Sequence, residues 1–200
     1  MTLETIAELL APYTAGSETA DWPRIHAQLL LYLDLILKWN ARVNLTAIRD
    51  PEEIVRRHFG ESLFAGAHLG RCATLLDYGS GAGFPGVPIQ LLRPDVQVTL
   101  AESRAKKAAF LLEVVRTLGL STEIWPHRVE AMAVNRTFDT VALRAVDEMP
   151  AAIAAAAARS THNVLILGML DASIPADFTL EASIPLPESH DAALIIATRR

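Results

Sequence analysis

A glycine-rich segment, residues 75–86, has the residue types and spacing of a site that binds an anionic group. It starts as an apolar strand that ends in Asp77. Glycine then stands at every second position, at Gly79, Gly81 and Gly83. Because glycine lacks a Cβ and tolerates positive φ, such a loop turns sharply and brings bare backbone against a ligand. Pro85 suits the first turn of a helix. A strand, a glycine loop and a helix N-terminus in this order predict a cradle for a cofactor with an anionic group.

An acidic residue follows where nucleotide-binding folds often place one. Glu102 ends the next apolar strand, about 20 residues beyond the glycines, where a carboxylate can accept hydrogen bonds from ribose hydroxyls. The alternative is that Glu102 only caps the helix expected to begin near Arg104. The spacing G-x-G-x-G fits the dinucleotide fingerprint poorly, although a nicotinamide-dependent oxidoreductase stays an alternative. With Asp77 before it, the spacing looks like motif I of S-adenosylmethionine-dependent methyltransferases.

Two further groups of polar residues are candidates for substrate binding. Arg144 ends a buried strand at the same sheet edge as the glycine loop, where ligands of open α/β sheets bind. The alternative is an arginine that only forms a salt bridge. A polar and basic patch precedes the sheet, and it includes Asn40, Arg42, Asn44, Thr46, Arg49, Arg56, Arg57 and His58. Taken alone, this patch is more typical of a solvated helix face with scattered ion pairs to Glu52 and Glu53.

The elements that must position these residues fall into two parts. Apolar residues at helical spacing predict helices over 2–12 and 22–40. Asp50, followed by Pro51 and two glutamates, has the pattern of a helix start, and a second short helical turn is expected over 61–67.

From residue 73 onward, strand and helix patterns alternate, which indicates a mostly parallel sheet with helices on both faces. The expected strands are 74–78, 96–101, 122–125, 138–143, 163–167 and 194–198. The expected helices are 87–93, 104–118, a short one near Val129, and 148–160. A short strand over 178–182 could pair antiparallel with the last strand as an edge hairpin.

Composition excludes several classes of protein. The chain has 200 residues, is 51% hydrophobic and 20% charged, and carries a net charge of −5, which suits a globular protein but not a wholly basic nucleic-acid binder. Cys72 is the only cysteine, so no internal disulfide can form. Since no leader, membrane span or Cys/His cluster stands out, we predict a soluble cytoplasmic protein without a metal.

Taken in order, the motifs between about residues 30 and 150 resemble one family, the bacterial 16S rRNA guanine-N7 methyltransferases, also called glucose-inhibited division protein B. The segment 39–46 looks like its W-N-x-x-x-N-L-T signature, and 57–63 is similar to its R-H-x-x-D-S-L. Residues 77–86 are near its D-x-G-S-G-A-G-F-P-G. The segment 102–111 is similar to its acid-S-x-x-K-R-x-x-F-L, and Arg144-Ala145-Val146 matches its strand end.

The resemblance implies a class I methyltransferase fold, Rossmann-like, with an N-terminal helical cap (1–68) and one compact methyltransferase domain (69–200). It implies S-adenosylmethionine as the methyl donor and N7 of a guanine in 16S rRNA, or in the small ribosomal subunit, as the acceptor. We expect a monomer. The cofactor would be bound by Asp77, Gly79, Ser80, Gly81, Gly83, Phe84, Glu102, Ser103, Arg128, Val129, Glu130 and Arg144. Arg144 would be the catalytic residue, and the RNA would contact Asn44, Arg57, His58 and Arg144.

One departure keeps an alternative open. After the strand near 163–167, the family's paired glycines and its terminal Lys-Gly have no counterpart around Gly168. The alternative is a protein of methyltransferase fold that binds S-adenosylmethionine but acts on another substrate, or on none.

Overall fold

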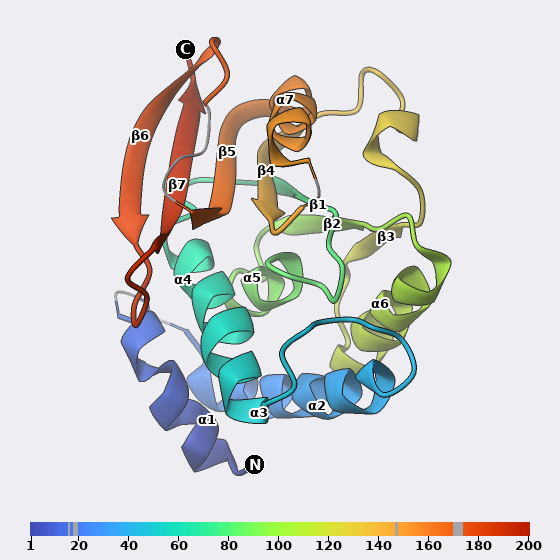
Figure 1. The fold of residues 1–200 in the computed structure, drawn as a ribbon, viewed down its shortest axis with the longest axis vertical. Coiled ribbons are helices and arrows are strands. Elements are labelled where there is room, and N and C mark those ends of the chain that lie inside the picture. The colour runs from blue at the N-terminus through green and yellow to red at the C-terminus, as the bar shows by residue number, and fades with distance from the viewer. Residues whose placement is uncertain (16, 18–19, 147, 170–173) are drawn as a thin grey trace.

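The computed structural model describes residues 1–15, 17, 20–146, 148–169 and 174–200. Its centre is a seven-stranded sheet with the strand order β3-β2-β1-β4-β5-β7-β6, and helices cover both faces (Figure 1). Within the described residues, no helix combines the length and hydrophobicity that a membrane crossing requires.

Five strands run parallel and two close one edge as an antiparallel hairpin. The parallel strands are β1 (Thr74–Tyr78), β2 (Gln97–Ala101), β3 (Glu123–Trp125), β4 (Phe138–Arg144) and β5 (Ser160–Met169). The hairpin consists of β6 (Phe178–Pro185) and β7 (Ala192–Arg199), and β7 pairs antiparallel with β5. In this order β1 lies between β2 and β4, so the chain following β1 leaves the sheet at the switch in strand order, where open α/β sheets bind ligands.

The helices before the sheet form a continuous layer below it in Figure 1. They are α1 (Leu3–Leu10), the 3₁₀ turn η1 (Ala11–Tyr13), α2 (Trp22–Asn40), α3 (Pro51–Glu53), the π-helix η2 (Ile54–Gly60) and α4 (Glu61–Ala67). The later helices are α5 (Gly86–Leu92), α6 (Ala105–Leu118), the 3₁₀ turn η3 (Val129–Ala131) and α7 (Met149–Arg159). Asp50 accepts a hydrogen bond from Glu53 N at 2.8 Å, which satisfies an otherwise unpaired amide where α3 begins.

Alternating side chains of the strands pack into two apolar layers. On one face, Leu75 and Leu100 join a buried cluster that also contains residues of α1, α2, α4, α5 and α6. On the other face, Leu76 and Leu143 pack against the alanines of α7, whose small side chains allow close approach to the sheet. The first cluster contains residues from both sides of position 68, so helical cap and sheet share one core. The division into two domains stays a prediction.

The mostly parallel sheet with helices on both faces and an antiparallel edge hairpin is confirmed. Local boundaries differ for physical reasons. Residues 51–67 form one helical run, because η2 joins α3 to α4 without a break. The strand expected at 163–167 already begins at Ser160, directly after α7, and pairs there with Phe138 of β4. The helix expected over 2–12 ends its α-helical part at Leu10 and continues as η1, whose second residue is Pro12.

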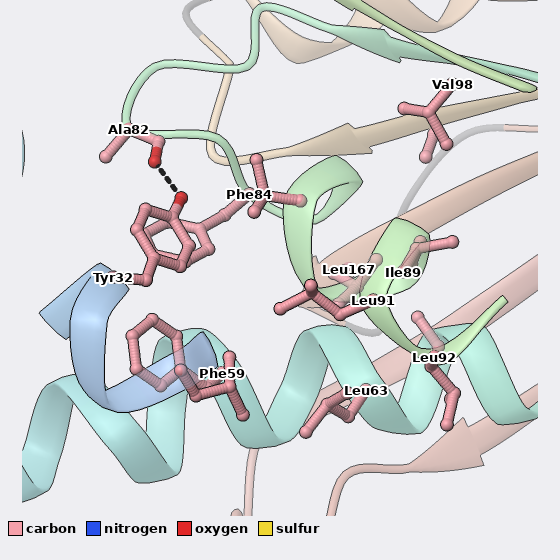
Figure 2. Close-up of a cluster of buried hydrophobic side chains, with 14 of the residues drawn as sticks. Tyr32, Phe59, Leu63, Ala82, Phe84, Ile89, Leu91, Leu92, Val98 and Leu167 are labelled. Atoms are coloured by element: carbon pink, nitrogen blue, oxygen red, sulfur yellow. Dashed lines mark hydrogen bonds between the residues drawn. The ribbon is translucent and has the colours of Figure 1, made fainter. Parts of the chain in front are cut away.

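The helical cap supports the glycine loop directly. The hydroxyl of Tyr32 on α2 donates a hydrogen bond to the carbonyl oxygen of Ala82 (Figure 2). The Tyr32 ring is fully buried and packs against Phe59 of η2 and Phe84, with ring centroids 5.2 and 5.6 Å apart. This close approach needs Gly83, because a Cβ at that position would collide with the Tyr32 hydroxyl and lie 2.8 Å from Val87 Cγ2.

We predict that Gly83→Ala destabilises the protein by about 2–4 kcal/mol, since it adds overpacking to the strain of positive φ. The matched control is Gly119→Ala, which has a similar left-handed requirement (φ +65° against +96°) but no atom within 4 Å of the new Cβ. The control should lose only about 1 kcal/mol. Urea unfolding of both variants measures the difference, and equal losses would contradict the proposed crowding at Gly83.

Candidate cofactor and substrate site

A pocket of about 910 Å³ opens at the carboxyl ends of β1, β2 and β4. The glycine loop forms one wall, and the segment 45–48 between α2 and α3 forms another. Twelve of the residues predicted from the sequence line it: Gly79, Ser80, Gly81, Phe84, Glu102, Ser103, Arg128, Val129, Glu130, Arg57, His58 and Arg144. Strands and helices distant in sequence therefore bring most of the predicted residues to one place. Among the described residues, no group of His, Cys, Asp or Glu side chains is arranged to hold a metal ion.

Three predicted residues do not line the pocket. Asp77 is fully buried beneath the loop, where its Oδ2 accepts a hydrogen bond from Gly86 N at 2.9 Å. Gly83 faces the Tyr32 hydroxyl. Asn44 is exposed, and its Oδ1 accepts a hydrogen bond from Arg49 Nη2 at 2.9 Å. Asp77 and Gly83 therefore shape the loop from behind, and Asn44 belongs to a surface pair in this structure.

Glu102 contacts both the start of α6 and the glycine loop, so the capping role is present, while its contact with ribose hydroxyls stays a prediction. Its Oε1 accepts a hydrogen bond from Arg104 N at 2.6 Å, just before α6. Its Oε2 accepts a hydrogen bond from Gly81 N at 3.1 Å, which ties the glycine loop to the end of β2. A carboxylate has about four acceptor positions, so capping and loop contact leave acceptor capacity toward the pocket.

The far wall of the pocket is set by Tyr78 and Glu130. The Tyr78 hydroxyl donates a hydrogen bond to Glu130 Oε1 at 2.7 Å. Burial and the Glu130 carboxylate raise the pKa of Tyr78 to about 12, so its phenol stays a neutral donor. The same hydrogen bond lowers the pKa of Glu130, which keeps that carboxyl ionised.

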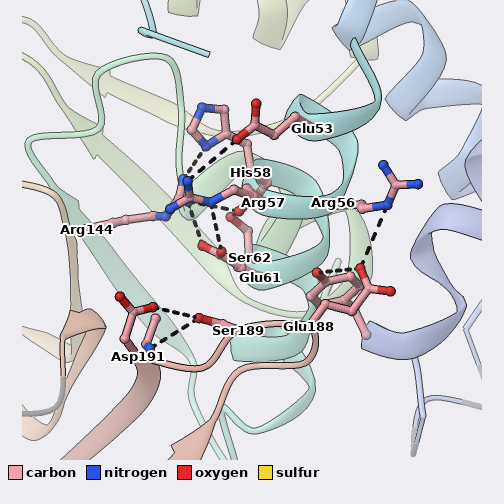
Figure 3. Close-up of polar contacts among 12 residues, drawn as sticks. Glu53, Arg56, Arg57, His58, Glu61, Ser62, Arg144, Glu188, Ser189 and Asp191 are labelled. Carbon is pink, nitrogen blue, oxygen red and sulfur yellow. Dashed lines mark hydrogen bonds and ion pairs between the residues drawn. The ribbon is translucent and has the colours of Figure 1, made fainter. Parts of the chain in front are cut away.

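Arg144 is held by the helical run on the opposite side of the pocket (Figure 3). Its Nη2 donates to Glu61 Oε2 at 2.6 Å and to the carbonyl oxygen of Arg57 at 2.9 Å. Its Nη1 donates to His58 Nδ1 at 2.5 Å. The side chains of Arg144 and Glu61 are only 12% and 9% exposed, so their ion pair is largely removed from water. The salt bridge considered as an alternative is therefore present, at the pocket wall.

His58 is neutral in this arrangement. Burial, followed by the charges of Arg144 and Arg57, lowers its pKa to about 3. Its ring stacks on Phe84 of the glycine loop with centroids 4.6 Å apart. Its Nε2 lies 2.7 Å from Thr46 Oγ1. The π-helical turn of η2 thus directs one imidazole toward Arg144, the glycine loop and the segment 45–48 at once.

Some further lining residues stood in the quoted motifs or the polar patch without an individual role. They are Thr46, Tyr78 and Lys107. Thr46 belongs to the W-N-x-x-x-N-L-T signature and to the polar patch, which was the available signal. Lys107 also stands within a quoted motif. Tyr78 stands in the glycine-rich segment 75–86. His127, which also lines the pocket, belongs to the segment 127–130, which the family resemblance implies would pass the adenine of the cofactor.

Comparison with solved structures shows the class of fold. The chain superposes on a ribosomal protein L11 methylase from Lactobacillus delbrueckii subsp. bulgaricus with a TM-score of 0.60, at 12% identity, covering 72% of this chain and 79% of the other. A putative methyltransferase, yhhF, from Escherichia coli gives a TM-score of 0.55 at 14% identity, covering 70% and 83%. The fold is therefore that of the class I methyltransferases.

Sequence comparison is more specific. Residues 25–169 match the family described as rRNA small subunit methyltransferase G. The protein of that name from Nitrosomonas europaea is 45% identical over 132 residues, 66% of this chain and 61% of the relative. The one from Xylella fastidiosa is 42% identical over 144 residues, 71% and 68%. The chain belongs to the rRNA small subunit methyltransferase G family, and its match spans about three fifths of the length of the Nitrosomonas relative.

We predict that Glu61→Gln lowers the free energy of unfolding by about 3 kcal/mol, because it leaves the buried Arg144 charge without its counter-ion. Glu53→Gln is the matched control. Glu53 pairs with Arg57 at 3.7 Å on the same helical run, but both side chains are about half exposed, so its loss should be below about 1 kcal/mol. Chemical denaturation of the two variants measures both losses. Similar small losses would mean that the Arg144 pair contributes no more than a surface contact.

The buried carboxyl of Asp77 makes the free energy of unfolding depend on pH. Burial raises the pKa of its carboxyl from 3.8 to about 7, against the opposing effect of the Gly86 N–H. Between these values the folded protein keeps a proton that the unfolded chain has released, so the stability due to Asp77 falls as pH rises from 4 to 7. We expect the unfolding free energy of the wild type, relative to Asp77→Asn, to decrease over this range by roughly 2–4 kcal/mol. A difference independent of pH would show that the carboxyl titrates normally.

Proposed function

We propose that this chain binds S-adenosylmethionine in the pocket and transfers its methyl group to N7 of a guanine in 16S rRNA, as a family member. The observation that carries the proposal is the juxtaposition of the glycine loop with Glu102 on one side and Arg144 on the other. It joins a place for a nucleoside cofactor to a place for a nucleotide substrate. A ribosomal substrate implies action in the cytoplasm.

The residues present fit the cofactor. Gly79 and Gly81 line the pocket with positive φ, so backbone rather than side chain faces a ligand there. A Cβ built on Gly81 would lie 3.9 Å from Lys107 Nζ, so a cation stands near the loop for a carboxylate. Glu102 has acceptor capacity for ribose hydroxyls, and Val129 with Ala152 offers an apolar surface for a purine. When bound, the cofactor supplies a methyl group activated by a sulfonium.

In this proposal Asp77 acts mainly through the loop. Its carboxylate holds the Gly86 amide, and its Oδ1, buried, has no hydrogen-bond partner. An ammonium group close to the loop would favour the ionised form of Asp77 through charge. The predicted contact with the amino-acid end of the cofactor is thus proposed as electrostatic, since Asp77 lies outside the lining.

The proposed chemistry needs no general base. N7 of guanine carries an exposed lone pair, so the chain has to orient the base and exclude water rather than remove a proton. Arg144 has five N–H groups, and three donate to Glu61, Arg57 and His58. The remaining two, in our proposal, hold O6 of the guanine or a phosphate oxygen, as arginine does in guanine and backbone recognition.

The surroundings of the pocket support a nucleic-acid substrate despite the acidic net charge. Among the residues that the structure describes, its lining contains more basic than acidic side chains. The basic ones are Arg57, Arg104, Lys107, Arg128 and Arg144, and the acidic ones are Glu102, Glu130 and Glu148. Such a local excess of positive charge suits a phosphate backbone.

The proposal is tested with labelled S-adenosylmethionine and small ribosomal subunits that lack the methyl group. We expect the label in 16S rRNA at a guanine, with chemical cleavage specific for N7-methylguanine locating it. Incorporation elsewhere, or binding of S-adenosylhomocysteine without any transfer, would favour the alternative of another substrate or none. A thermal shift with NAD but not with S-adenosylhomocysteine would contradict the whole assignment.

We predict that Arg144→Ala reduces methyl transfer at least about 100-fold, because the substrate loses charge-assisted hydrogen bonds. Its dissociation constant for S-adenosylhomocysteine should change less than about threefold, because in our proposal Arg144 contacts the nucleotide and not the cofactor, to which the resemblance also assigned it. Isothermal titration and single-turnover transfer measure the two quantities, and Arg144→Lys should recover only part of the rate. Transfer at the wild-type rate would refute the role of Arg144.

A further inference from the structure

Thr46 lines the pocket, and the side chain of Asn40 fixes its backbone in position. Asn40, at the end of α2, is 7% exposed, and its Oδ1 accepts hydrogen bonds from Leu45 N at 2.8 Å and Thr46 N at 3.2 Å. Its Nδ2 donates to the Thr46 carbonyl oxygen at 3.1 Å. One buried amide therefore holds both backbone groups of Thr46, a residue of the pocket wall.

The protonation of His58 follows from its partners. A guanidinium has only N–H donors, so the contact of Arg144 Nη1 with His58 Nδ1 requires a lone pair on Nδ1. A neutral imidazole with a lone pair on Nδ1 carries its proton on Nε2. The lowered pKa of His58 agrees with the neutral form. Nε2 therefore donates to Thr46 Oγ1 at 2.7 Å.

Thr46 Oγ1 then has no acceptor capacity left. It accepts from His58 Nε2 and also from Ile48 N at 3.2 Å, and a hydroxyl oxygen has two lone pairs. Its only remaining function is to donate its own proton. Within the described residues, no acceptor for that proton is found, and the residue lines the pocket. The contact with Arg144 therefore fixes the tautomer of His58, and this tautomer leaves the Thr46 hydroxyl as a hydrogen-bond donor.

We propose that Thr46 is a specificity-determining residue that donates its hydroxyl proton to an oxygen of the target nucleotide, either the carbonyl O6 of the guanine or a phosphate oxygen. This inference rests on the proposed methyl transfer to guanine. If O6 is the acceptor, the same hydroxyl disfavours adenine. Adenine carries an amino group at this position, which is itself a donor and cannot accept the proton of Thr46. His58 is then a positioning residue, since it acts on the substrate only through Thr46.

The test compares wild type, Thr46→Val and Thr46→Ser in single-turnover transfer to small subunits. Valine keeps the shape and removes the donor, and we expect a loss of about tenfold or more in kcat/KM, the amount of a good hydrogen bond. Serine keeps the hydroxyl and should restore most of the lost transfer. Affinity for S-adenosylhomocysteine and the thermal midpoint of each variant show that it is folded and binds the cofactor.

Thr46→Val also removes the acceptor of His58 and Ile48, so the substrate must distinguish a direct contact from a structural effect. Small subunits reconstituted with 2-aminopurine in place of the target guanine keep N7 and lack O6. In subunits with a methylphosphonate beside the target, a methyl group replaces one non-bridging phosphate oxygen, and its negative charge is lost. The ratio of wild-type to valine-variant rates should fall to about one on the first substrate for a contact to O6, or on the second for a contact to phosphate.

A ratio that stays near tenfold on both modified substrates would overturn the proposal, because Thr46 would then act only by supporting His58. A Thr46→Val enzyme as active as the wild type would overturn it as well. Failure of the wild type to methylate unmodified subunits refutes the proposed function instead, so the two failures are separable.

Discussion

The site depends on how the backbone of residues 79–86 is held. Three buried groups fix it from three directions: the Tyr32 hydroxyl on the Ala82 carbonyl, the Asp77 carboxyl on the Gly86 amide, and the Glu102 carboxylate on the Gly81 amide. A glycine loop alone has high conformational entropy, which ligand binding would have to overcome. Because these side chains come from α2, β1 and the end of β2, the loop is shaped before any ligand arrives. The proposed cofactor site therefore depends on contacts throughout the core and not on the glycine motif alone.

The same arrangement makes the helical cap part of the site. Phe84, on the glycine loop, contacts the rings of Tyr32, Phe59 and His58, all from the N-terminal helices. Arg144 approaches from β4 and ends its side chain among residues of η2 and α4. The walls proposed for the cofactor and for the substrate therefore share one aromatic cluster. A shift of the helical run would change both walls together. The residues before and after position 68 therefore contribute to one core and one pocket.

Much of this was predictable from the sequence because the signals were local. The order of strand, glycine loop, helix and acid places Glu102 beside the loop, and strand-end residues of a parallel sheet necessarily meet at one edge. What could not be predicted depends on contacts between distant residues. Asp77 is buried beneath the loop, which turns at Gly79. Its carboxyl therefore supports the loop through the Gly86 amide instead of lining the pocket. Thr46 reaches His58 twelve residues away, and His58 reaches Arg144 eighty-six residues away. The π-helical turn that brings them together has no recognisable sequence pattern.

The distribution of charge around the pocket is consistent with methylation of a neutral nitrogen. In the proposed reaction the guanine becomes cationic at N7, and a free positive charge 4 Å away would oppose this by about 4 kcal/mol at an effective dielectric constant of 20. His58, at the proposed substrate wall, is neutral because burial lowers its pKa to about 3. Arg144 lies 2.6 Å from Glu61, so the field of the guanidinium is largely cancelled at the distance of a base. The buried pair thus allows Arg144 to offer hydrogen bonds to the nucleotide without offering net charge. A variant without the Glu61 carboxylate would keep the hydrogen bonds from Arg144 to the nucleotide but restore the repulsion between the guanidinium and the cationic guanine. Such a variant would separate hydrogen bonding by Arg144 from the effect of its charge.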